Sequence, residues 1–263
     1  MTDMTDTHFP DDMPKAVLIT GAAHRIGRAL ALDLASAGWA VAIHYNTSAD
    51  AARTLVDEIT NAGGRADMVA GDLACEQNVE TLVARASAAI GPLGCLINNA
   101  SIFENDSPET ATRASWDAHM ETNLRAPFVL TQAFARALSD GQTGAVINII
   151  DQRVWNLTPY FTSYSLSKAG LWALTQTLAQ ALAPRIRVNA IGPGPTLPSE
   201  RQSEEDFQRQ WRAMPLGRPV DVAEIAAAVR FILGARAMTG QMIALDSGQH
   251  LGWAPAPASG PEE

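Results

Sequence analysis

The chain has 263 residues, 47% hydrophobic and 18% charged, and can bury about three quarters of its unfolded surface in one large domain or two small ones. Its formal charge is −9 and its Lys and Arg residues are scattered, so nucleic acid binding is not expected. Cys75 and Cys95 lack the spacing of a zinc site or a disulfide framework, which indicates a reducing compartment without a bound metal. No run approaches the ~20 apolar residues of a membrane span and residues 1–14 contain no signal-peptide core, so we expect a cytoplasmic protein that binds no membrane.

Short apolar runs rich in β-branched residues alternate with longer helical patterns along most of the chain. This alternation requires crossover helices, and it predicts a doubly wound α/β domain whose parallel sheet is covered on both faces. Strands are expected at 16–20, 40–45, 66–70, 95–98, 145–150, 187–190 and 241–245. Helices are expected at 28–37, 49–62, 79–90, 116–138, 164–182 and 221–233. The single domain should span 14–253, between flexible tails at 1–13 and 254–263 that are rich in Pro, acidic and small residues.

A glycine-containing segment, Thr20-Gly-Ala-Ala-His-Arg-Ile-Gly27, follows the first expected strand and opens the next helix. The small residues from Gly21 allow backbone N–H groups to approach a pyrophosphate, while Gly27 allows the helix to pack closely on the strand. Two glycines alone are weak evidence, but their position between a strand and a helix is typical of a dinucleotide site. Gly21, Arg25, Ile26 and Gly27 are therefore candidate cofactor-binding residues.

The end of the second expected strand bears on the choice of cofactor. An NAD site usually has Asp or Glu there to bind the ribose diol, whereas this chain has His44-Tyr45-Asn46-Thr47-Ser48. An acid would repel a 2′-phosphate, while these side chains can donate hydrogen bonds to one, so we expect NADPH in preference to NADH. No Arg or Lys replaces the acid, and the alternative is that His44 and Tyr45 only pack within the strand.

Further cofactor contacts are expected where other strands end, because ligands of open α/β sheets bind outside the carboxyl edge. Asp72 follows the third strand, with Leu73 beside it, and is a candidate acceptor for the adenine amino group. Asn99, Ala100 and Ser101 follow the fourth strand and are candidates for a wall of the cofactor site, although an Asn pair can also be simple turn chemistry.

Tyr164 and Lys168 lie four residues apart at the start of an expected helix, so both side chains project from one face. A lysine ammonium favours phenolate, and it lowers a tyrosine pKa of ~10 toward the range useful for proton transfer to a carbonyl or imine. Taken alone, this spacing favours an ordinary surface pair. The other motifs of the chain favour a catalytic pair.

The long irregular stretch at 192–214 contains five Pro or Gly residues before a polar helical patch at 204–212. A segment of this length inside a domain is either a lid over a substrate or a surface excursion. Two weaker signals accompany it. Gln152, Arg153 and Trp155 either shape a substrate pocket or contact another subunit, and the small, apolar segment 166–181 favours an oligomer.

Together with Pro193-Gly194, these motifs occur in the order and spacing of the short-chain dehydrogenase/reductase family, which the chain resembles over nearly its whole length. The resemblance implies a single Rossmann-like domain, a nicotinamide cofactor, a homotetramer and a place for Pro193 and Gly194 in the cofactor site. It also implies Tyr164 as proton donor and Lys168 as partner of the tyrosine and the nicotinamide ribose. Asn123, in Glu121-Thr-Asn-Leu124, would organise a proton-relay water.

Two departures from the usual family pattern resemble the pteridine reductases. Most members have serine at the end of the fifth strand, where this chain has Asp151, and many have glycine in the first turn, where it has Arg25. In that branch Asp, Tyr and Lys act together, the turn arginine faces the pterin, and a serine and a phenylalanine fall on Ser101 and Phe103. Thr47 differs from the basic residue that many pteridine reductases have there.

A pterin is a flat bicycle with an amide-guanidine edge, so its site requires a stacking face and polar groups around the rim. We expect Phe103 to press the ring against the nicotinamide, Ser101 and Arg25 to contact the rim or the cofactor phosphate, and Asp151 with Tyr164 to protonate a ring nitrogen. The expected reaction is NADPH-dependent reduction of a dihydropterin, such as dihydromonapterin or dihydrobiopterin, with some activity on dihydrofolate. The alternatives are a short-chain dehydrogenase of ketones or secondary alcohols and a sensor that binds the cofactor without turnover.

Overall fold

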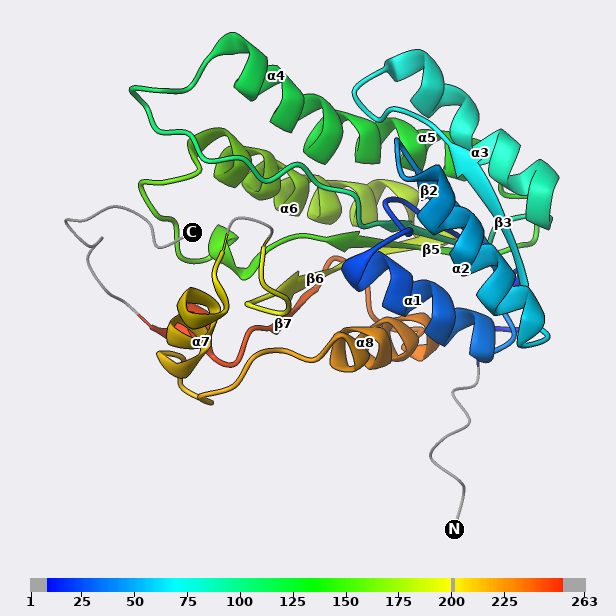
Figure 1. Ribbon diagram of the computed structural model, residues 1–263. Helices are drawn as coiled ribbons and strands as arrows, with labels where there is room; N and C mark the ends of the chain where they lie inside the picture. Colours follow the sequence, from blue (N-terminus) through cyan, green and yellow to red (C-terminus); the bar gives the residue numbers. More distant parts are fainter. Residues whose placement is uncertain (1–8, 200–201, 253–263) are drawn as a thin grey trace.

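Seven parallel strands form one sheet in the computed structural model, which describes residues 9–199 and 202–252 (Figure 1). Their order is β3-β2-β1-β4-β5-β6-β7. Strands β1 to β3 extend the sheet in one direction and β4 to β7 in the other, so the topological switch point lies between the neighbouring strands β1 and β4. The doubly wound, seven-stranded sheet expected from the sequence is confirmed. The strands are β1 Ala16–Ile19, β2 Ala40–Tyr45, β3 Arg65–Ala70, β4 Cys95–Asn98, β5 Gly144–Ile149, β6 Ile186–Pro193 and β7 Met242–Leu245.

Helices cover both faces of the sheet (Figure 1). Helices α1, α2 and α8 contribute to one hydrophobic core, and α3, α5 and α6 to the other. Their bounds are α1 Arg25–Ser36, α2 Ala49–Asn61, α3 Glu76–Ile90, α4 Arg113–Met120, α5 Ala126–Ala137, α6 Thr162–Leu182, α7 Glu204–Arg212 and α8 Val222–Gly234. Within residues 9–199 and 202–252, no helix combines the length and hydropathy needed to cross a membrane.

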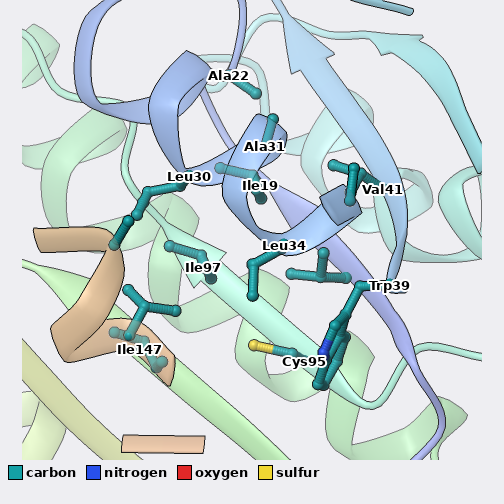
Figure 2. Close-up of a cluster of buried hydrophobic side chains, with 14 of the residues drawn as sticks. Ile19, Ala22, Leu30, Ala31, Leu34, Trp39, Val41, Cys95, Ile97 and Ile147 are labelled. Atoms are coloured by element: carbon teal, nitrogen blue, oxygen red, sulfur yellow. The ribbon is translucent and has the colours of Figure 1, made fainter. Parts of the chain in front are cut away.

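The core beneath α1 fixes the start of the glycine-containing turn. Leu30 and Leu34 of α1 pack over Ile19 of β1 and Ile97 of β4, and all four side chains are fully buried (Figure 2). Each fully buried Leu or Ile contributes about 1.5–3 kcal/mol through removal of apolar surface from water. The turn between β1 and α1 is thus held from both ends by packed side chains.

One expected helix, at 116–138, is interrupted by a π-helical turn at Glu121–Arg125. Pro127 lacks the N–H that an uninterrupted α-helix would offer to the carbonyl of Asn123, and its ring would clash with that carbonyl. The N–H of Ala126 instead donates to the carbonyl of Glu121, five residues back. The proline therefore separates α4 from α5 at the turn that carries Asn123.

The packed part of the chain begins earlier than expected. Phe9 and Met13 are buried, and the Phe9 ring meets Trp39 edge to face at a centroid distance of 5.3 Å. The expected tail at 1–13 is therefore wrong for residues 9–13, because an isolated phenylalanine in a polar segment gives no periodic signal. Residues 1–8 and the expected tail at 254–263 lie outside the described residues.

Candidate active site

A cavity of about 450 Å³ opens at the carboxyl edge of the sheet. Its walls come from the turn after β1, the loop after β4, the end of β5, the first turns of α6 and the segment that follows β6. The candidate residues in these walls are Gly21, Arg25, Ile26, Gly27, Asn99, Ala100, Ser101, Phe103, Asp151, Tyr164, Lys168, Pro193 and Gly194. The cavity lies at the switch point between β1 and β4, where open α/β sheets bind their ligands.

Three ionisable side chains meet in this cavity. The Tyr164 hydroxyl donates to Oδ2 of Asp151 at 2.9 Å, and Oδ1 of Asp151 accepts from the backbone N–H of Arg153 at 2.8 Å. Lys168 donates from Nζ to the carbonyl of Ile149 at 3.0 Å, and its Nζ lies 5.8 Å from the centre of the Tyr164 ring. The end of β5 and one face of α6 therefore hold a phenol between a carboxyl group and an ammonium group.

Burial changes the proton affinity of Lys168. Lys168 is only 2% exposed, and this burial lowers its pKa to about 8. The attraction of the Asp151 carboxylate acts in the opposite direction. The ammonium is therefore the prevailing form near neutral pH, and it becomes neutral in mildly alkaline solution.

We expect kcat to fall as pH rises through about 8, because the Lys168 ammonium that favours phenolate at Tyr164 is lost there. The unfolded chain, with an ordinary lysine pKa of ~10.4, binds more protons between these two values, so the contribution of Lys168 to the free energy of unfolding rises with pH over the same window. Activity and stability should thus diverge. The free energy of unfolding in urea and kcat are both measured from pH 6 to 10, for the wild type and for Lys168→Met as the control. If the free energy of unfolding of the wild type, but not that of the control, falls together with kcat, the prediction is contradicted.

The glycine-containing turn leaves no room for a side chain at Gly21 or Gly27. Gly21 has φ +62°, and a Cβ there would lie 3.0 Å from Cα of Ala100. A Cβ on Gly27 would lie 2.4 Å from the carbonyl oxygen of Gly21 and 2.6 Å from Nδ2 of Asn99. Asn99 closes the turn by donating from Nδ2 to the carbonyls of Thr20 and Gly21 at 2.8 and 3.1 Å. This close backbone turn before the N-terminus of α1 fits a pyrophosphate group.

Arg25 connects the turn to the segment after β6. Its guanidinium donates to the carbonyls of Pro198 at 2.7 Å and Leu197 at 3.0 Å, and the residue itself adopts φ 53°. Leu197 also lines the cavity, so this part of the stretch at 192–214 forms part of its wall, and closure over a substrate stays a prediction. The predicted position of the Arg25 guanidinium between phosphate and pterin stays a prediction. Its contacts with Leu197 and Pro198 join residues more than 170 positions apart, which no local pattern indicates.

We expect Arg25→Ala to raise the KM of the substrate about tenfold, because a hydrogen bond from a charged donor is worth about 1.5 kcal/mol. Arg28→Ala is a matched control, since Arg28 lies one turn along α1 and pairs with Glu58 outside the cavity. Steady-state kinetics of both variants test this contact. Equal KM values for the two would show that the link to Leu197 and Pro198 is irrelevant to substrate binding.

The candidates for the adenosine half lie outside the cavity walls: His44, Tyr45, Asn46, Ser48, Asp72 and Leu73. His44 accepts from the N–H of Gly21 through Nδ1 at 3.0 Å, so Nε2 carries the proton and donates to the carbonyl of Gly71 at 3.0 Å. Burial lowers the pKa of His44 to about 4 and keeps the ring neutral. His44 therefore braces the glycine turn, and the expectation that it donates to a 2′-phosphate does not fit this geometry.

The roles of the other residues of this group in binding the adenosine half of the cofactor stay predictions. Asn46 is exposed at the end of β2, and Ser48 is half-buried at the N-cap of α2. Asp72 accepts from the N–H of Ala74 at 2.9 Å, and Leu73 is buried. Asn46, Ser48 and Asp72 all stand beyond the ends of β2 and β3, beside the glycine turn.

Asn123 is fully buried and uses its side chain to hold the loop after β4. Its Oδ1 accepts from the N–H of Ile102 at 2.8 Å, and its Nδ2 donates to the carbonyl of Ile102 at 2.9 Å and to the hydroxyl of Ser167 at 3.1 Å. Ser101 contacts the same amide, with its hydroxyl 3.3 Å from Oδ1. The role of Asn123 as organiser of a relay water stays a prediction, compatible with the π turn that alters the pairing of its carbonyl.

Phe103 lines the cavity next to Tyr164 and stacks on Phe161, which lies behind it outside the cavity walls. Phe103 and Phe161 stack with centroids 4.4 Å apart and planes 10° apart, and Phe103 meets the Tyr164 ring edge to face at 4.6 Å. The Arg153 guanidinium lies 5.5 Å from the Phe103 centroid and 5.1 Å from that of Phe161. Phe161 was missed from the sequence, as were the cavity residues His24, Ile149, Ile150 and Gln249. The sequence indicated the stretch at 192–214 only as a whole, and its cavity residues are Pro193, Gly194, Pro195, Thr196, Leu197, Ser199, Gln202, Phe207 and Gln210. No local pattern shows which individual side chains of these segments reach the cavity, because distant segments bring them together.

Residues 15–209 match the family model of the short chain dehydrogenases. The chain belongs to this family. The 3-oxoacyl-[acyl-carrier-protein] reductase FabG of Staphylococcus epidermidis is 31% identical to this short-chain dehydrogenase over 244 residues, which cover 91% of the chain and 100% of the relative. Membership makes the protein a nicotinamide-dependent oxidoreductase. Among residues 9–199 and 202–252, no group of three or more His, Cys, Asp or Glu is arranged to hold a metal ion.

Two solved structures are more similar in sequence. FolM alternative dihydrofolate reductase 1 of Brucella suis, in complex with NADP, is 51% identical with a TM-score of 0.89, over 95% of this chain and 98% of that chain. Its counterpart from Brucella canis, complexed with NADP, is 50% identical with a TM-score of 0.86, over 90% and 95%. The predicted family is confirmed, and the chain lies close to the pteridine reductase branch.

Proposed function

We propose that this short-chain dehydrogenase is an NADPH-dependent reductase of pterins, which converts a dihydropterin to the tetrahydro form. The observation that carries the proposal is the hydrogen bond from Tyr164 to Asp151, at the position where most family members have serine. The aromatic wall at Phe103 supplies the flat apolar surface that a bicyclic ring requires. Identity of 50–51% to two FolM alternative dihydrofolate reductases supports the same substrate class.

NADPH is the proposed cofactor, and when bound it would supply a hydride. The close turn at Gly21–Gly27 and the N-terminus of α1 fit its pyrophosphate, while Asn99 to Ser101 and Pro193-Gly194 would hold its nicotinamide half. Asn46, Ser48 and Asp72 would hold its adenosine half. The NADP bound in both Brucella relatives supports this assignment, and NADH is expected to serve less well.

The chain's own residues supply the proton. Tyr164 gives its hydroxyl proton to the ring nitrogen next to the reduced carbon, and the phenolate that remains is stabilised by the ammonium of Lys168. Asp151 accepts the phenol hydrogen bond before transfer and so orients the hydroxyl. A carboxyl group there can also share a proton with the phenol, which a serine hydroxyl does far less readily.

Steady-state oxidation of NADPH and NADH separates the candidate functions. The substrates should be dihydromonapterin, dihydrobiopterin, dihydrofolate and a 3-oxoacyl thioester, with Tyr164→Phe as the inactive control. Pterin-dependent NADPH consumption supports the proposal. Turnover of the thioester alone would favour a ketone reductase like the FabG relatives, and cofactor binding without turnover of any substrate would favour a sensor.

We further propose a homotetramer in the cytoplasm. Leu166 on α6 and Phe231 on α8 expose 47% and 58% of their surface, as expected of helices that pack against another subunit, and Cys75 and Cys95 are both free. Size-exclusion chromatography with light scattering measures the assembly directly. A monomeric mass at micromolar concentration would contradict it.

A further inference from the structure

A buried polar cluster lies behind Tyr164, outside the cavity walls. It joins Asp106 of the loop after β4, His119 of α4 and Ser163 in the first turn of α6, which are 3%, 0% and 0% exposed. The Ser163 hydroxyl lies 2.5 Å from Oδ2 of Asp106 and 2.7 Å from Nδ1 of His119. Oδ1 of Asp106 also accepts from the N–H of Ser163 at 3.0 Å. We call these three residues the buried clamp.

The direction of each hydrogen bond follows from one fixed donor. The backbone N–H of Glu104 donates to Nε2 of His119 at 3.1 Å, so the neutral ring carries its proton on Nδ1. That N–H faces the Ser163 hydroxyl and the carbonyl of Ser115, 2.9 Å away. The Ser163 hydroxyl is then free to donate its own proton to Asp106, and the cluster forms a one-way chain from His119 through Ser163 to Asp106.

Asp106 is the required acceptor at the end of this chain. Burial raises the pKa of its carboxyl. The hydrogen bonds from the side chain and backbone of Ser163 and from Ser115 lower the pKa by more than burial raises it, so it lies below its ordinary value. An ionised carboxylate can accept all of these bonds at once. An amide in its place would point an N–H group at one of the same donors.

A Ser, a His and an Asp in contact are also the components of a hydrolytic triad, but this arrangement differs from one. The carboxylate of Asp106 bonds Ser163 and not His119, so it does not orient the imidazole as a base. All three side chains are buried, so no substrate reaches Ser163. The clamp therefore has no nucleophilic role.

The buried clamp joins the loop after β4 to the start of α6, the two segments that surround Tyr164. Ser163 directly precedes Tyr164, and the adjacent N–H of Thr162 donates to the carbonyl of Asp106 at 3.1 Å. The loop held by Asp106 also carries Phe103, whose ring contacts Tyr164. Phe161, at the N-cap of α6, adopts a left-handed φ of 56°, which costs about 1–2 kcal/mol and requires the surrounding contacts to maintain it.

We propose that Asp106, His119 and Ser163 are positioning residues that aim the Tyr164 hydroxyl at Asp151 and hold Phe103 against the cavity. The inference rests on the proposed function only for the substrate used in the assay. Misplacement of a reacting group by about 1 Å costs on the order of 10²-fold in rate. Asp106→Asn should therefore lower kcat about 10- to 100-fold, while the affinity for NADPH, which depends on the separate turn at Gly21–Gly27, stays within about twofold.

The test compares Asp106→Asn, Ser163→Ala and their double variant with Glu109→Gln, a matched acid-to-amide change at an exposed position of the same loop. Each variant is assayed for kcat with dihydromonapterin, for the Kd of NADPH by tryptophan fluorescence, and for amide hydrogen exchange in peptides covering 101–107 and 159–165. We expect lower kcat, unchanged Kd, faster exchange in both peptides, and a double variant no slower than the worse single variant, since the residues act as one unit. Ser163→Ala keeps the test available if Asp106→Asn does not fold.

Two results would overturn the inference: kcat and exchange like those of Glu109→Gln in both single variants, or a Kd for NADPH that rises in parallel with the loss of kcat. Failure of the proposed function gives a different pattern, because wild-type protein would then consume no NADPH with the pterin. In that event the hydrogen-exchange rates of the two peptides test the positioning role of the buried clamp without the kinetics. Faster exchange in both peptides than in Glu109→Gln supports this role, and equal rates refute it.

Discussion

Tyr164→Phe should lower kcat for a dihydropterin about 10²- to 10⁴-fold, the usual contribution of a positioned proton donor. The phenyl ring that remains keeps the edge-to-face contact with Phe103, so the packing of the wall should persist. What is lost is the hydroxyl that donates to Asp151 at 2.9 Å. Steady-state kinetics with NADPH in excess measures the effect.

Tyr160→Phe is the matched control for this change. Tyr160 lies four residues before Tyr164 and does not line the cavity, so removal of its hydroxyl should leave kcat within about twofold. An equal loss of kcat in both variants would mean that the helix start, and not the Tyr164 hydroxyl, limits the reaction. A Tyr164→Phe variant that retains full activity would remove the proposed proton donor altogether.

Asp151→Ser restores the residue that most family members have, and it should lower kcat for the pterin about 10²-fold. The serine can still accept from the N–H of Arg153, so the short helix at Gln152–Val154 should keep its cap. It cannot carry the negative charge that faces Tyr164. Asp151→Asn, which retains the shape and removes the charge, should show a loss of similar size.

The ratio of pterin to 3-oxoacyl thioester turnover in these two variants gives the sharper readout. If the carboxyl group adapts the site to a pterin, the ratio falls in both variants. Full pterin turnover with serine at position 151 would show that the acid is a neutral local variant, and it would favour the ketone reductase alternative.

The parts of the site that follow from neighbours along the chain could be predicted from the sequence. Tyr164 and Lys168 share a helix face because of their spacing, and Gly21 and Gly27 occur where a strand meets a helix. The parallel sheet order then brings the ends of β1, β4, β5 and β6 to one edge. These rules apply to short segments or to whole strands, and each is independent of side-chain rotamers.

The contacts that were not predicted connect side chains far apart in sequence. His44 has its two ring partners 23 and 27 residues away, and Arg25 bonds carbonyls 172 and 173 residues away. For His44, residue type alone indicated a donor to a 2′-phosphate, because it cannot show that the carbonyl of Gly71 accepts the ring N–H. The roles of Arg25 toward the cofactor phosphate and the pterin stay predictions. The π turn at Asn123 did have a local signal, since Pro127 follows four residues later.

The most direct measurement follows the hydride itself. Dihydromonapterin is reduced with NADPH that carries deuterium at the transferable position of the nicotinamide, and the product is analysed by mass spectrometry and NMR. Transfer of one deuterium to the ring carbon of the former imine, with a proton from solvent on the adjacent nitrogen, is the predicted result. A pterin recovered without deuterium, while the same enzyme places deuterium on the carbonyl carbon of a 3-oxoacyl thioester, would contradict a pterin reductase built on Asp151, Tyr164 and Lys168.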